Sequence, residues 1–147
     1  CSAVSAQAHG WTSPDHSGWI GPQFGAHFGH EEVEYSAGLE VSYWAQPKFR
    51  GQNVFWEPVQ IGIDAGVEYN FSRDKWLHYA ELQTSIIFGG TSFGLAWDED
   101  YGMGIQWSSW VNWLAGGMIR VRQFRDDAST GEWSLGAYAK GPYFYID

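Results

Sequence analysis

Apolar and polar side chains alternate with a period of two along most of this chain. In residues 33–45 the odd positions, from Val33 to Ala45, are apolar or aromatic, whereas the even positions carry Glu, Ser, Gly and Trp44. Residues 59–71 and 80–88 repeat the pattern. Side chains of a strand point alternately to its two faces, so this spacing predicts long β-strands with one apolar and one polar face.

The same pattern divides most of the chain into consecutive strands with short connections. We expect strands at residues 18–30, 33–45, 55–71, 76–88, 91–97, 101–113, 118–125 and 133–145. Residues 72–75 are expected to form a tight polar turn, and the glycine pairs at 89–90 and 116–117 to form reversals. Because no helix-length segment separates the strands, the sequence predicts an all-β fold, an antiparallel up-and-down β-barrel of about eight strands.

Domain organisation follows from the same pattern. Residues 1–17 show no sustained period and are expected to form an N-terminal tether. Residues 18–147 are expected to form a single barrel domain, and 147 residues suffice for one such domain.

The composition of the polar face indicates which side of the strands looks inward. A soluble barrel turns its apolar face inward, whereas a barrel in a membrane turns it to lipid and keeps a polar interior. The polar face here is rich in Gly and Ser, and the whole chain has only 8 Lys and Arg residues. Small residues suit the crowded lumen of a narrow barrel. We therefore expect the polar face to line the interior.

Charges of both signs fall on this polar face. Ile119 and Val121 occupy the apolar parity of their strand, which leaves Arg120 and Arg122 on the face of the acids. Buried charges need partners. We expect both arginines to pair with at least two acids of this face, and Arg120→Leu to lower stability strongly. The predicted lumen charge cluster is Glu34, Glu40, Asp64, Glu68, Glu81, Arg120, Arg122 and Lys140.

Aromatic residues are unusually frequent, with 10 Trp, 8 Tyr and 9 Phe. Tryptophans near the ends of membrane-spanning strands form belts at the lipid–water interface. Tryptophans can instead fill the core of a small β-protein or form an exposed platform that stacks on sugars. The residues expected to form an interface belt are Trp44, Trp56, Trp76, Trp97 and Trp133.

The net charge of the chain limits the classes of binding partner, and the position of its single cysteine indicates a cellular location. The net charge of −9 disfavours nucleic acid as a partner. Cys1, followed by the small residues Ser2, Ala3 and Ser5, resembles the start of a mature bacterial lipoprotein, in which the cysteine carries the lipid. The rival interpretation takes residues 6–8, Ala-Gln-Ala, as the end of a conventional signal peptide. Both interpretations imply export.

The sequence offers few catalytic or metal-binding patterns. His27 and His30 are three residues apart beside Glu31 and Glu32, but on a strand their rings point to opposite faces. His78, Glu81 and Ser85 could be drawn as a hydrolase triad, yet His78 differs in parity from the other two. We expect no catalytic residues, no metal and no cofactor.

The chain as a whole resembles the class of small eight-stranded outer-membrane barrels. The resemblance implies a non-enzymatic, lipid-anchored protein of the bacterial outer membrane, with a structural or scaffolding role, the lipid bilayer as partner and other envelope proteins as further candidates. The alternative is a soluble, secreted barrel or sandwich that binds an apolar ligand or a carbohydrate through Trp and Tyr. In that case Trp107 and Trp113 would contact the ligand, and the Glu/Gly face would be exposed to solvent.

Overall fold

A computed structural model describes residues 16–29, 32–46, 59–86, 89–111, 115–125 and 131–146. Of residues 143–146 it describes the backbone alone. The strands are β1 (His16–Phe28), β2 (Glu34–Ala45), β3 (Gln60–Asn70), β4 (Lys75–Ile86), β5 (Gly89–Asp98), β6 (Gly102–Val111), β7 (Ala115–Phe124), β8 (Gly131–Ala139) and β9 (Gly141–Ile146). Among these residues no helix is long and apolar enough to cross a membrane.

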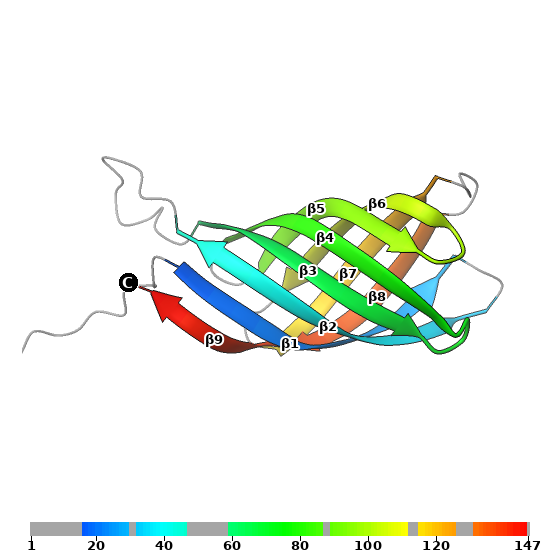
Figure 1. Ribbon diagram of the computed structural model, residues 1–147, viewed down its shortest axis with the longest axis horizontal. Helices are drawn as coiled ribbons and strands as arrows, with labels where there is room; N and C mark the ends of the chain where they lie inside the picture. Colours follow the sequence, from blue (N-terminus) through cyan, green and yellow to red (C-terminus); the bar gives the residue numbers. More distant parts are fainter. Residues whose placement is uncertain are drawn as a thin grey trace, which may run out of the picture.

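The strands form a closed antiparallel up-and-down barrel, which confirms the predicted fold class. Consecutive strands from β1 to β8 pair with each other, and β1 closes the sheet by pairing with both β8 and β9. The two last segments act as one wall strand interrupted at Lys140, so the barrel is eight-stranded. Figure 1 shows the strands running obliquely around the long axis.

The two ends of the barrel differ. At one end, here called the turn end, Asn70 Oδ1 accepts hydrogen bonds from the backbone N–H groups of Ser72 (3.0 Å) and Arg73 (3.1 Å) and shapes the β3–β4 turn. Asp98 Oδ1 does the same for the β5–β6 turn. The other end, here called the loop end, holds the start of β1 and the end of β9 (Figure 1).

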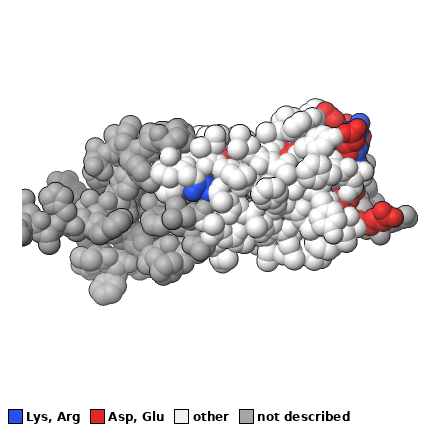
Figure 2. All heavy atoms as spheres, turned by 90° about the horizontal axis from the view of Figure 1, so that it is seen from below, with Lys and Arg blue, Asp and Glu red and all other residues white. Residues whose placement is uncertain are grey.

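The polarity of the wall is the reverse of that of an ordinary globular protein. The described interior side chains are mostly polar, and the large apolar side chains point outward, where many are 40% exposed or more. At the described outward positions of β1 to β8 there is no Asp, Glu, Lys or Arg. In Figure 2 the described wall is largely white, and charged atoms gather at the turn end. The polar face of the sequence therefore lines the interior.

The expected reversals at the two glycine pairs are wrong. Gly89 and Gly90 belong to β5, and Gly116 and Gly117 belong to β7. Packing explains the first pair: a Cβ on Gly90 would lie 2.3 Å from the Trp110 ring, so the interior leaves no room for a side chain there. Residues 87–88 and 112–114, which precede these two strands, lie outside the described residues.

Candidate functional site: the polar interior

Glu68 on β3 is the centre of an ion-pair network that spans the lumen. Arg122 Nη2 donates to both of its carboxylate oxygens at 2.9 Å, and Arg120 Nη1 donates to Oε1. Gln23 Nε2 on β1 adds a further hydrogen bond to Oε1 at 3.1 Å. All four side chains are buried. The arrangement joins opposite walls of the barrel and satisfies the charges that it buries.

Toward the turn end the network continues through Glu132. Its Oε1 accepts from Arg122 Nη1 (2.9 Å) and lies 2.8 Å from His27 Nδ1. The other ring nitrogen of His27 lies 2.7 Å from Ser36 Oγ, and Arg122 Nε donates to Gln106 Oε1. Arg122 thus bonds to three interior side chains besides contacting His27, which fixes its position.

Arg73 closes the interior at the turn end. Its Nε donates to Glu34 Oε2 and its Nη2 lies on Asp98 Oδ2, both at 2.9 Å. The guanidinium also lies over the Tyr101 ring, 5.0 Å from its centroid. Burial opposes the charge on Arg73, but the carboxylates of Asp98 and Glu34 outweigh it and raise the pKa of the guanidinium. Arg73 is therefore a permanent cation between the acids of this end.

On the loop-end side of Glu68, Glu40 takes the central position. Tyr79 donates its hydroxyl to Glu40 Oε2 at 2.7 Å, and Lys140 Nζ donates to Oε1 and also contacts Ser42 Oγ at 3.0 Å. The Arg120 guanidinium lies over the Tyr79 ring, 4.5 Å from its centroid. Tyr79 therefore connects Glu40 with the central network.

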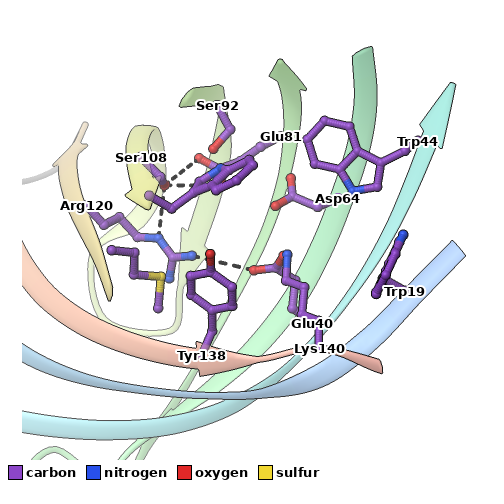
Figure 3. A pocket seen from close by; sticks show the side chains of 12 residues that line it. Trp19, Glu40, Trp44, Asp64, Glu81, Ser92, Ser108, Arg120, Tyr138 and Lys140 are labelled. Carbon is purple, nitrogen blue, oxygen red and sulfur yellow. Dashed lines mark hydrogen bonds and ion pairs between the residues drawn. The ribbon is translucent and has the colours of Figure 1, made fainter. Parts of the chain in front are cut away.

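A small cavity of about 30 Å³ lies next to Glu40. Glu81 lines it and accepts hydrogen bonds from Ser108 Oγ at 2.9 and 3.3 Å. Asp64 lines it as well, and its Oδ1 is buried without a hydrogen-bond partner. Figure 3 shows both carboxylates pointing into this space, with Trp44 at its edge. Trp44 packs edge-on against Trp110, with ring centroids 5.9 Å apart.

The eight residues of the predicted lumen charge cluster all have inward positions, and all but Lys140 are buried. Arg120 contacts Glu68 and lies 3.9 Å from Glu40, so it meets two of the expected acids. Glu34 pairs with Arg73. The soluble alternative required the acids of the polar face to be exposed to solvent. Instead, they are buried in the interior.

Several members of the interior network were not predicted from the sequence. They are Gln23, His27, Arg73, Tyr79, Asp98, Gln106 and Glu132. Glu132 has the same parity as the inward-pointing Ser134. A predicted strand that began at Gly131 would therefore have placed Glu132 in the interior. Arg73 gives no such signal, because it lies in a turn and reaches inward through its long side chain.

The predicted interface aromatics are partly wrong. Trp44 is 5% exposed and packs inside the barrel, because it has the parity of Glu40 and Ser42. Trp76, Trp97 and Trp133 point outward near the turn end, each 45% exposed. Cys1, Trp56 and Trp113 lie outside the described residues.

The patterns considered for chemistry do not assemble into a catalytic or metal site. His78 points outward beside Trp97, whereas Glu81 and Ser85 point inward. In the described segments no three His, Cys, Asp or Glu side chains are arranged to hold a metal ion. His30, the partner considered for His27, is not among the described residues. Neither a protein-family model nor a curated protein matches this chain.

Proposed function

We propose that this protein spans the outer membrane of a bacterium as a sealed β-barrel with a structural, non-enzymatic role. The observation behind the proposal is the wall: its described outward positions are mostly apolar and free of Asp, Glu, Lys and Arg, while carboxylates and arginines fill the inside. This is the polarity of a barrel whose solvent is lipid.

The extent of exposed apolar surface supports the same environment. Phe24 on β1, Leu82 on β4 and Val111 on β6 are 59%, 69% and 64% exposed, although they lie on different sides of the barrel. A soluble monomer rarely exposes a contiguous apolar patch above about 300–600 Å². The main wall strands, β1 to β8, have 9–13 residues, which matches the roughly 9–11 residues of a tilted strand that crosses a bilayer.

The turn end supplies a rim of the kind found at a membrane surface. Trp76, Trp97 and Trp133 share the same level near the ends of their strands. Beyond them lie the exposed charges of the turns, including an ion pair between Lys75 and Asp100 at 3.4 Å. Aromatic rings followed by charged turns favour a position at the lipid–water boundary.

The filled interior favours a structural role over transport. Glu68, Arg120 and Arg122 cross the lumen as a buried ion-pair network, and Arg73 closes its turn end. An interior of this width is occupied by side chains and leaves no aqueous channel. We expect the protein to insert into a bilayer without conducting ions.

The test is folding and insertion of the purified chain. We expect it to fold in detergent micelles and in phosphatidylcholine vesicles, to resist protease in the vesicles, and to give no conductance steps in a planar bilayer. A folded, monodisperse protein in buffer without detergent would contradict the membrane assignment. Stable unitary conductance would contradict the sealed interior and with it the structural role.

A further inference from the structure

The cavity at the loop end contains an unsatisfied acid. Asp64 is 6% exposed, and its Oδ1 has no hydrogen-bond partner. The two other carboxylates of the cavity are already held: Glu40 by Tyr79 and Lys140, and Glu81 by Ser108. A buried acceptor without a partner is costly, so this oxygen is suited to a donor from outside the chain.

The charges around the cavity favour a cation over an anion. Three carboxylates, Glu40, Asp64 and Glu81, line it together with two cations, Arg120 and Lys140. Both cations are already engaged with acceptors of the barrel, Arg120 with Glu68 and Lys140 with Glu40. An anionic ligand would therefore meet acids and cations that are already engaged, whereas a cationic donor would meet the open Oδ1 of Asp64.

Aromatic rings complete the surroundings of the acids. The cavity is lined by Trp19, Trp44, Trp110 and Tyr138. The Lys140 ammonium already lies 5.4 Å from the centroid of the Tyr138 ring. Aromatic faces attract ammonium groups, and the attraction adds to that of a nearby carboxylate. The wall of the cavity thus already holds one ammonium group of the chain in this way.

We propose that the loop-end cavity binds the primary ammonium group of a small organic amine, with Asp64 as its principal acceptor. A cavity of about 30 Å³ exceeds the roughly 10–15 Å³ that one water molecule requires, so it has room for an –NH₃⁺ group of similar size. The rest of the amine would extend toward the loop end, past Trp19 and Trp110, which are only half-buried. A quaternary ammonium group has no N–H to donate to Asp64 and is therefore a poor ligand here.

The test uses n-butylammonium as the probe and protein labelled with 5-fluorotryptophan in detergent micelles. Substitution of Trp44 or Trp110 by Phe assigns their ¹⁹F signals. We expect n-butylammonium to shift both signals saturably, and 1-butanol and tetrabutylammonium to leave them unshifted. Equal shifts with 1-butanol would show mere partitioning of the alkyl chain and would overturn the proposal, as would the absence of a saturable shift.

Two isosteric variants and a matched control locate the acceptor. Asp64→Asn should weaken n-butylammonium binding by about tenfold or more, the loss expected for one hydrogen bond to a charged group. Glu81→Gln provides a second reading should Asp64→Asn fail to fold, and it should also weaken binding. Glu99→Gln, at an exposed turn position of the opposite end, should bind as the unaltered chain does. Unchanged affinity in a folded Asp64→Asn variant would overturn the assignment.

Amine binding at the loop end is independent of the proposed membrane role. Binding is measured in micelles and does not depend on which membrane the barrel occupies or on whether it conducts. A failure of membrane insertion would leave the amine site testable, and a failure of amine binding would leave the membrane assignment as it is.

Discussion

Replacement of Glu68 by Gln tests whether the interior network stabilises the barrel. Glu68 is 3% exposed and accepts hydrogen bonds from Arg120, Arg122 and Gln23. A glutamine of the same shape removes the charge and leaves the two arginines without their shared carboxylate. Breaking a buried ion pair by removing one partner costs about 3–5 kcal/mol. Because Arg122 keeps Glu132 at 2.9 Å, we expect a loss near the lower limit, about 3 kcal/mol.

The assay is reversible unfolding by urea in lipid vesicles, followed by tryptophan fluorescence. Asp64→Asn is the matched control, since it is the same kind of change on an equally buried acid of the same strand. Oδ1 of Asp64 has no hydrogen-bond partner, so this variant should be as stable as the unaltered protein or more stable.

Two results would contradict a stabilising role of the Glu68 network. One is a Glu68→Gln variant that unfolds within about 0.5 kcal/mol of the unaltered protein, as surface substitutions do. The other is an equal loss in both variants, which would mean that any interior acid matters regardless of its partners. Arg120→Leu removes the other side of the same contact and should cost about 3–5 kcal/mol.

Two further predictions concern the inner and outer surfaces of the wall. Gly66→Ala should destabilise by about 1–3 kcal/mol in the same urea assay, because a Cβ there would lie 2.3 Å from the Tyr79 ring. Gly117→Ala, whose nearest new contact would be 3.8 Å away on the outer face, should be tolerated, and an equal loss would contradict the packing argument. Phe93→Arg at mid-wall should cost about 2–4 kcal/mol in vesicles, whereas Met103→Arg near the turn end should cost about 0–1 kcal/mol. Equal effects of the two arginines would contradict a lipid-facing wall with a depth profile.

The strands and the direction of their side chains were predictable because both depend on local alternation. Parity alone separated Ile119 and Val121 from Arg120 and Arg122, and these arginines do lie in the interior. Parity also places Trp44 inside, but its position near a strand end suggested a role at the interface. The alternation of the strand was the better guide, since a side chain cannot leave its face without a bulge.

The partners across the lumen were beyond prediction from alternation. Arg122 meets Glu132 on the neighbouring strand, but it meets Glu68 only because the barrel closes and brings β3 opposite β7. The Lys140 ammonium reaches Glu40 because the wall strand is interrupted between β8 and β9. Contacts of this kind depend on closure and register, which the spacing along one strand does not contain.

Depth-dependent quenching by brominated lipids shows directly whether the outer wall of the barrel faces lipid. The measurement compares the unaltered protein with Trp107→Phe, Trp97→Phe and Trp44→Phe in vesicles whose lipids carry bromine either deep or shallow in the acyl chains. If the wall faces lipid, the Trp107 contribution is quenched most by deep bromine, the Trp97 contribution by shallow bromine, and Trp44 inside the barrel least by either. Outward tryptophans that brominated lipid leaves unquenched, but that a water-soluble quencher reaches, would contradict the account.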